Sequence, residues 1–176
     1  MSMPSNLLKF LNGAIVVLSI LVCSMLLLLR LPGMELLGIG PNWLLIWVVS
    51  WSITRTIWQG LLAGVTLGLI HDGMTAVYPS HILSLVLVGV LTASLRRQLY
   101  LQENLISVVL IVFFMVIVAE TAIAIQYSLM YLRPLKEIWQ DYLRIAIVSA
   151  TLSSLWAPAL YYPLNQWWAK LRKLEK

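Results

Sequence analysis

Apolar residues run along this chain in long segments separated by short polar stretches. The segments cover approximately Leu11–Leu29, Trp43–Ile53, Ile57–Ile70, Ile82–Leu95, Leu105–Leu132 and Ile145–Trp168. A helix needs about 20 apolar residues to cross a bilayer. The first, fifth and sixth segments have that length, the fourth has it if it begins near Pro79, and the second and third are shorter. The pattern predicts an all-α integral membrane bundle.

The composition agrees with a membrane location. The chain has 176 residues, of which 61% are hydrophobic and 11% are charged. A soluble domain carries about 25% charged residues, so the charges here are too few to cover a water-facing surface. No polar stretch is long enough to form a second unit, and residues 1–176 are expected to form a single polytopic membrane domain. The net charge of +5 is therefore expected to serve contact with membrane lipids and not with nucleic acid.

The charged positions decide between six transmembrane helices and five. Either a tight turn at Thr54–Thr56 separates the second and third segments, or both form one bent helix that holds Arg55 in the membrane. A lone arginine at that depth costs at least about 2.5–3.5 kcal/mol. The charge pattern therefore favours six helices, with five as the alternative.

With six helices, most of the basic residues lie on the side of the two termini. They are Lys9, Arg55, Arg96, Arg97, Lys170, Arg172, Lys173 and Lys176. The other side carries Arg30, Arg133, Lys136 and Arg144, together with the acids Glu35, Asp72, Glu137 and Asp141. Basic residues are enriched in cytoplasmic segments. The sequence therefore predicts a multi-pass protein with both termini cytoplasmic and with Arg55, Arg96 and Arg97 on the inner face.

A glycine ladder marks the third apolar segment. Gly60, Gly64, Gly68 and Asp72 follow one another at intervals of four residues. Residues four apart share one face of a helix, so the glycines form a smooth groove. In lipid, small residues allow two helix backbones to approach closely. We expect another helix to lie in this groove, either from this chain or from a partner. Asp72 then reaches the outer interface, where it faces water or bonds to loop backbone.

Glu120 is an isolated carboxylate in the fifth segment, with no other charge within ten residues on either side. Such a group must be protonated, paired, or in contact with a wet cavity. One interpretation is a neutral acid that bonds to neighbouring backbone or hydroxyl groups, in a network shared with Thr121 and Gln126. The other is a polar contact between helices or a relay site.

Tryptophans at positions 43, 47 and 51 form a second stripe with a period of four residues. We interpret Trp43, Trp47 and Trp51 as a packing or lipid-facing surface, and a binding face for a partner's helix remains the alternative. Signatures of catalysis such as GxSxG, HExxH or GxxxxGK[ST] are absent from the sequence. His71, Asp72 and His81 make only a weak metal pattern. No catalytic, cofactor-binding or metal-ligating residues are therefore predicted.

The order of these motifs resembles the MreD family of bacterial rod shape-determining membrane proteins. A proline, Pro41, opens the second span, and Arg55 precedes the glycine ladder that ends at Asp72. A fourth span with Gly89 ends in Arg96 and Arg97, and an acid, Glu120, lies mid-membrane in the fifth. The last span carries an A-P-x-L-Y pattern, Ala157 to Tyr161, before a basic tail. The resemblance covers about residues 10 to 173. The chain departs from it after Asp72, where a Leu-Gly step is often found, and near Ser153 and Ser154, where an asparagine is frequent.

The resemblance implies a non-catalytic scaffold subunit of the peptidoglycan elongation complex in the bacterial cytoplasmic membrane. Its expected partners are the transmembrane helix of MreC and, with it, MreB, RodA and a class B penicillin-binding protein. The glycine groove or the tryptophan stripe would receive the MreC helix. The fold is expected to be similar to the substrate-binding subunits of energy-coupling-factor transporters. A subunit that binds a small molecule, as those do, is therefore the alternative function.

Overall fold

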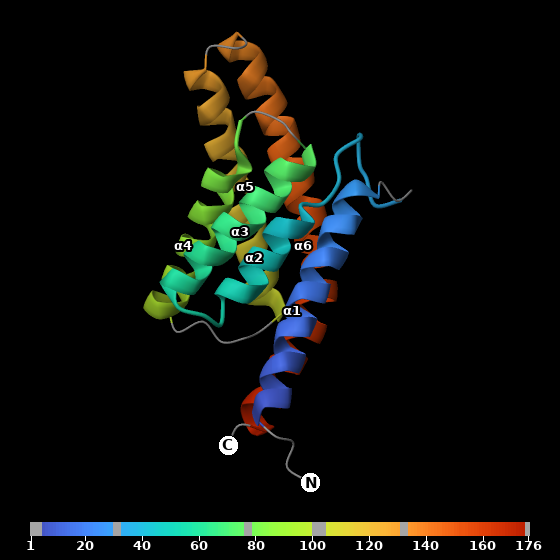
Figure 1. The fold of residues 1–176 in the computed structure, drawn as a ribbon. Coiled ribbons are helices and arrows are strands. Elements are labelled where there is room, and N and C mark those ends of the chain that lie inside the picture. The colour runs from blue at the N-terminus through green and yellow to red at the C-terminus, as the bar shows by residue number, and fades with distance from the viewer. Residues whose placement is uncertain (1–4, 30–32, 76–78, 100–104, 131–133, 175–176) are drawn as a thin grey trace.

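Six α-helices make up the regular structure in the part of the chain that the computed structural model describes, residues 5–29, 33–75, 79–99, 105–130 and 134–174. They are α1 (Ser5–Leu28), α2 (Trp43–Ser52), α3 (Ile57–Thr75), α4 (His81–Leu99), α5 (Leu105–Leu129) and α6 (Leu135–Leu174). Successive helices run in opposite directions, and both termini lie at one end, which we call the termini end (Figure 1). The opposite end, with the segment 33–42, is the distal end. The all-α prediction is confirmed.

The short helix α2 lies at the centre of the bundle. It packs against each of the other five helices, and nine of its ten residues are buried. A helix that is apolar all round belongs in an interior, and the run WLLIWVV provides such a helix. At 1.5 Å per residue its length is about 15 Å, which is half of a hydrocarbon core of about 30 Å. The second predicted span is therefore too short to cross the membrane by itself.

A tight turn joins α2 to α3. The amide of Thr54 donates to the carbonyl of Trp51 at 3.3 Å, and the amide of Arg55 donates to the carbonyl of Ser52 at 3.2 Å. Arg55 therefore lies in the turn and not within a bent helix, so the alternative of a single bent segment is wrong. The turn lies at the termini end, as does the C-terminal end of α4 (Figure 1). Arg96 and Arg97 belong to that end of α4, but their side chains are outside the described part.

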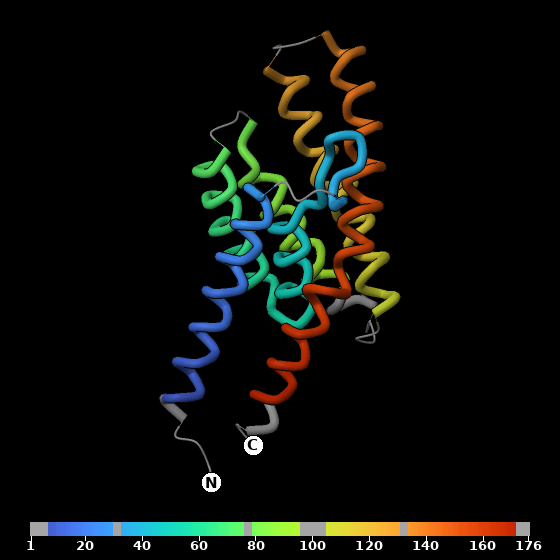
Figure 2. Tube along the Cα trace, turned by 90° about the vertical axis from the view of Figure 1, so that its right-hand side faces the viewer, coloured from blue at the N-terminus to red at the C-terminus, as the bar shows by residue number. Residues whose placement is uncertain are grey.

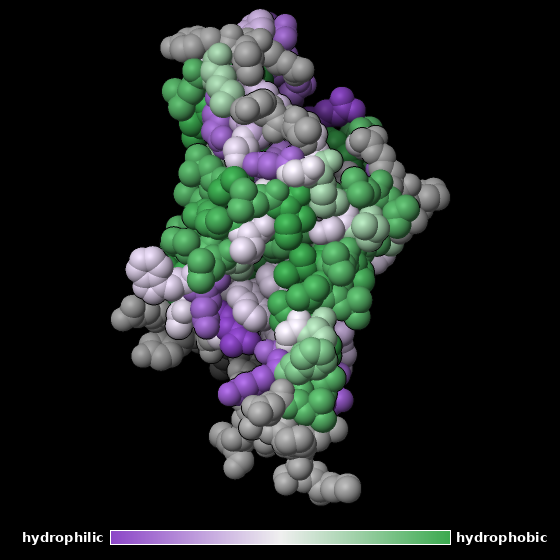
Figure 3. Space-filling model, viewed as in Figure 1, coloured by the Kyte–Doolittle hydropathy of each residue, from purple (hydrophilic) through white to green (hydrophobic). Residues whose placement is uncertain are grey.

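Three helices are long and apolar enough to cross a membrane, over Leu7–Leu28, Leu105–Leu129 and Leu135–Leu171. The last of them begins ten residues before Ile145 and contains the predicted sixth apolar segment. Its 40 residues correspond to about 60 Å. An apolar band crosses the middle of the molecule, with polar residues above and below it (Figure 3). This is the surface expected of a membrane protein, and six crossings stay a prediction.

Three outer helices extend beyond the rest of the described bundle. The outer turns of α5 and α6 reach beyond the other helices at the distal end, and α1 and α6 do so at the termini end (Figures 1 and 2). The helix α6 contains Pro158 and Pro163, and it bends in its C-terminal part (Figure 2). Proline removes a backbone donor and clashes with the preceding turn, which explains a bend at this place.

The glycine ladder of α3 is filled by α4 of the same chain. A Cβ atom on Gly60 would lie 2.5 Å from the carbonyl oxygen of Gly89, and one on Gly64 would lie 2.6 Å from that of Leu85. A Cβ on Gly68 would lie 2.5 Å from the Cα of Ile82. The two backbones therefore touch along an antiparallel crossing of about two turns. Of the two occupants that the sequence left open, the structure places this chain's own helix in the groove.

We predict that Gly64→Ala destabilises the fold by about 1–3 kcal/mol, the usual cost of overpacking a tight contact. The matched control is Gly73→Ala on the same helix, because a Cβ there meets no described atom within 4 Å. Gly73→Ala is expected to be neutral or slightly stabilising, since alanine is the better helix former. The measurement is the midpoint of thermal unfolding in detergent. Equal midpoints for the two variants would contradict the backbone contact.

Candidate functional site

A cavity of about 380 Å³ opens among the helices at the distal end. The segment 33–42, the end of α1 and the adjoining ends of α2, α3 and α4 surround it, and α5 and α6 close the other side. Its polar wall is made by Glu35, Asn42, His71, His81, Glu120, Tyr127 and Ser149. The rest of the wall is mostly aliphatic, with Trp43 on one side. The cavity therefore combines apolar walls with a few convergent polar groups, as ligand sites commonly do.

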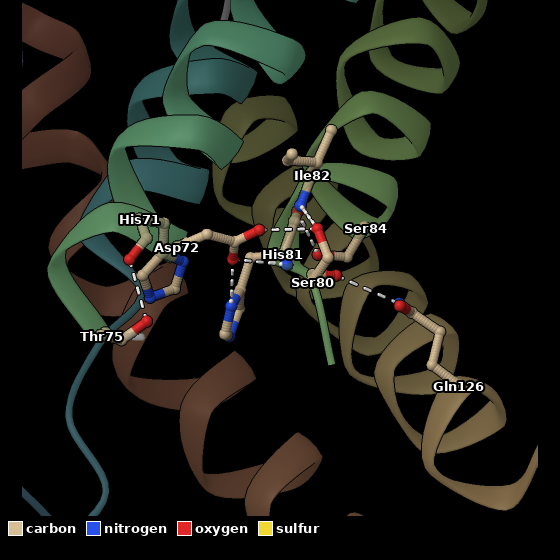
Figure 4. Close-up of polar contacts among 8 residues, drawn as sticks. All are labelled: His71, Asp72, Thr75, Ser80, His81, Ile82, Ser84 and Gln126. Carbon is tan, nitrogen blue, oxygen red and sulfur yellow. Dashed lines mark hydrogen bonds and ion pairs between the residues drawn. The ribbon is translucent and has the colours of Figure 1, made fainter. Parts of the chain in front are cut away.

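Asp72 links the ladder to this cavity by capping the neighbouring helix (Figure 4). Its carboxylate accepts hydrogen bonds from the Ser80 hydroxyl at 2.6 Å and from the His81 amide at 2.8 Å. The Nδ1 atom of His81 lies 2.9 Å from the same carboxylate. The Ser80 hydroxyl accepts in turn from the Ile82 amide at 3.2 Å. The first amides of a helix lack partners within it, so Asp72 satisfies the start of α4 from α3.

The two histidines of the predicted weak metal pattern do come together. The rings of His71 and His81 lie 3.8 Å apart between centroids, and Asp72 contacts the second of them. His71 is buried, and its Nδ1 atom has no hydrogen-bond partner among the described residues. Within the described ranges, no three His, Cys, Asp or Glu side chains are arranged so that they could hold a metal ion.

Glu120 lies between two hollows, because it lines both the 380 Å³ cavity and a second one of about 140 Å³. No hydrogen bond or ion pair joins it to another residue of the described ranges. The network expected around it is not formed. Thr121 contacts the carbonyl of Ile117 and, at 2.8 Å, the hydroxyl of Tyr142, while Gln126 donates to the carbonyl of Ser80 at 3.3 Å. Thr121 and Gln126 thus form hydrogen bonds with other residues and not with Glu120.

The tryptophan stripe is covered by this chain. Trp43 and Trp47 are buried, and the indole of Trp47 donates to the hydroxyl of Ser19 on α1 at 2.9 Å. Trp43 packs on Trp156 of α6, with ring centroids 5.7 Å apart. The rings of Trp51 and of Trp168 on α6 lie 5.3 Å apart between centroids. The guanidinium of Arg55 lies over the Trp51 ring, 4.4 Å from its centroid. The stripe is thus a packing surface inside the bundle and leaves no open face for a partner's helix at Trp43 and Trp47.

Some cavity residues were not singled out from the sequence. Asn42, at the end of the segment 33–42, caps α2 through its side chain and donates its backbone amide to the Ser153 hydroxyl on α6 at 2.9 Å. An asparagine just before an apolar run is a known start signal for a helix, and it agrees with the predicted start of this segment at Trp43. Tyr127 and Glu35 carry no comparable signal.

Loss of the Asp72 cap is expected to loosen the first turn of α4. We predict that Asp72→Ala lowers the free energy of unfolding by about 1–2 kcal/mol, the usual value of an N-terminal cap. Asp72→Asn keeps a side-chain oxygen that accepts from the His81 amide. Its free energy of unfolding should therefore lie between those of Asp72→Ala and the unsubstituted chain. The measurement is hydrogen exchange at the start of α4 in detergent micelles. Exchange in Asp72→Ala as slow as in the unsubstituted chain would show that the bond does not hold the helix.

Comparison with known proteins identifies a family over nearly the whole chain. The family model of the rod shape-determining protein MreD matches residues 6–170. Neither a curated protein nor a solved structure matches. The expected similarity to the subunits of energy-coupling-factor transporters therefore finds no support, and neither does the small-molecule alternative that rested on it. The match spans the glycine ladder, the Asp72 cap and the distal cavity, and the chain belongs to the MreD family of rod shape-determining membrane proteins.

Proposed function

We propose that this chain is a non-catalytic scaffold subunit of the peptidoglycan elongation complex and that its distal cavity receives a segment of MreC. The observation that carries this proposal is that the two docking surfaces expected from the sequence are filled, while the distal cavity is open. The glycine groove is filled by α4, and the tryptophan stripe is covered by α1 and α6. The distal cavity is the surface among these three that stays open.

The charge distribution supports an orientation with the cavity outside the cell. The start of α1, the turn between α2 and α3 and the end of α6 lie at the termini end (Figure 1), and they carry Lys9, Arg55 and Lys170. The end of α3 and the first turns of α6 lie at the distal end (Figure 1), where Asp72, Glu137 and Asp141 offset Lys136 and Arg144. Because basic residues are retained on the cytoplasmic side, this arrangement favours cytoplasmic termini in the bacterial inner membrane. The cavity then faces the compartment in which the extracytoplasmic domain of MreC works.

The arrangement of the polar groups supports a binding role. A hydrolytic triad needs a nucleophile bonded to a histidine that is itself bonded to a carboxylate. Here the Ser80 hydroxyl donates to Asp72, and His81 contacts the same carboxylate, so both groups serve the helix cap. Through MreC the subunit would help to organise MreB, RodA and a class B penicillin-binding protein and so maintain cell shape.

A bulky residue in the cavity is expected to exclude MreC. Ile123 of α5 lines both hollows, whereas Ile125 on the same helix is exposed. We predict that Ile123→Trp lowers the amount of MreC that co-purifies in mild detergent by about tenfold or more. The matched Ile125→Trp should leave it unchanged. Recovery of MreC with Ile123→Trp at the level of Ile125→Trp, both being monodisperse, would refute the cavity as the docking site.

The orientation has its own test. Thr56 lies in the turn at the termini end, and Gln140 lies near the start of α6; both are exposed. We predict that a membrane-impermeant maleimide labels Gln140→Cys in intact spheroplasts and labels Thr56→Cys only after lysis. The native Cys23 is fully buried, so the unsubstituted chain serves as the blank. The reverse labelling would place the cavity on the cytoplasmic side.

A further inference from the structure

We propose that the distal cavity recognises a basic side chain, a lysine ammonium or an arginine guanidinium, on the partner segment that enters it, with Glu120 as its counter-charge. This inference rests on the proposed function and names the chemistry by which the cavity would select its occupant. The observations behind it are an acidic side chain without a partner in the cavity wall and the lack of lysine and arginine among the described residues of that wall.

The first step is that Glu120 is the carboxylate of the site left without a partner. Asp72 accepts from Ser80 and from the amide of His81, and it also contacts the His81 ring. Glu120 has no such contact with any residue of the described ranges. A carboxylate at membrane depth is costly unless it is paired or neutralised, so an incoming cation would gain from meeting it.

The second step is that the helix N-termini around the cavity are not capped by the Glu120 carboxylate. The N-termini of α2 and α4 border the cavity at Asn42, Trp43 and His81. A helix N-terminus carries a partial positive charge that attracts anions. Here each end already has its own acceptor, since Asn42 caps α2 and Asp72 caps α4. Glu120 therefore remains available to a ligand.

The third step is that the rest of the wall suits a cation with hydrogen-bond donors. Among its described residues, the wall contains no lysine or arginine that would repel one. Glu35 is a second acid in the wall, and Trp43 and Tyr127 provide aromatic rings. The buried Nδ1 of His71 has no partner among the described residues, and it accepts a hydrogen bond in the tautomer that carries the proton on Nε2. Aromatic faces attract ammonium and guanidinium groups.

The test compares two identical changes of charge. Glu120→Gln removes the carboxylate inside the cavity, and Glu137→Gln makes the same change at an exposed site in the first turn of α6. We expect Glu120→Gln to weaken MreC binding to the purified chain by about 30-fold or more, the lower range for loss of one member of a buried charge pair. We expect Glu137→Gln to stay within about twofold. Equal effects of the two variants would overturn the proposal, because general electrostatic attraction would then explain them.

A competition experiment identifies the recognised group. Butylammonium should displace MreC from the unsubstituted chain at concentrations at which butanol does not, and this difference should vanish in Glu120→Gln. Displacement by both compounds alike would mean that the cavity selects apolar bulk, and it would overturn the proposal. A small organic amine that stays on the purified chain in native mass spectrometry and is not displaced by MreC would also overturn it.

The outcomes separate this inference from the proposed function. If Ile123→Trp excludes MreC while Glu120→Gln binds it normally, the cavity is the docking site and the recognition of a cation is wrong. If Ile123→Trp binds MreC normally, the docking site itself is wrong. Size-exclusion profiles equal to that of the unsubstituted chain are required of each variant, so that loss of folding is not read as loss of binding.

Discussion

Direct contact between the backbones of α3 and α4 is the constraint on which the rest of this structure depends. Gly60, Gly64 and Gly68 remove every side chain from one face of α3, and α4 lies against the bare backbone. Lipid offers little hydrophobic gain for helix association, so dispersion across such close contacts must provide the attraction. The spacing of four residues then continues to Asp72, which reaches the first amide of α4 at the end of the same crossing. One stripe thus sets both the distance between the two helices and their register.

The central position of α2 follows from this tight pair. The helix lies against α3 and α4 and also contacts α1, α5 and α6, and its tryptophans fill the space toward α1 and α6. Toward α1 and α6 the helices are held apart, and large aromatic rings fill the space between them. Between α3 and α4 the glycines bring the backbones into contact, and no side chain is needed to fill a gap. The indole donor of Trp47 is satisfied by Ser19, as a buried polar group at this depth requires. The glycine ladder and the tryptophan stripe therefore both pack against helices of this chain.

The sequence predicted the helices, the turn at Arg55 and the existence of the ladder, because each depends on local periodicity and on the cost of a charge in lipid. It did not identify what fills the ladder or covers Trp43, since a period of four residues specifies a face and not the partner of that face. It placed Glu120 in a network with Thr121 and Gln126, but those residues bond elsewhere. It did not identify the cavity wall around the segment 33–42, because a wall formed by several distant segments leaves no periodic signal.

The shortness of α2 has a consequence for how this architecture can vary. The helix begins at Trp43, and Gly40, Pro41 and Asn42, which lead into it, form the floor of the distal cavity. The cavity thus borders the N-terminal end of α2. Adding a turn to α2 would make the recess shallower, and shortening the helix would deepen it, without changing the α3 and α4 crossing. The point at which this one inner helix starts is therefore a means of setting the size of the group that the recess admits.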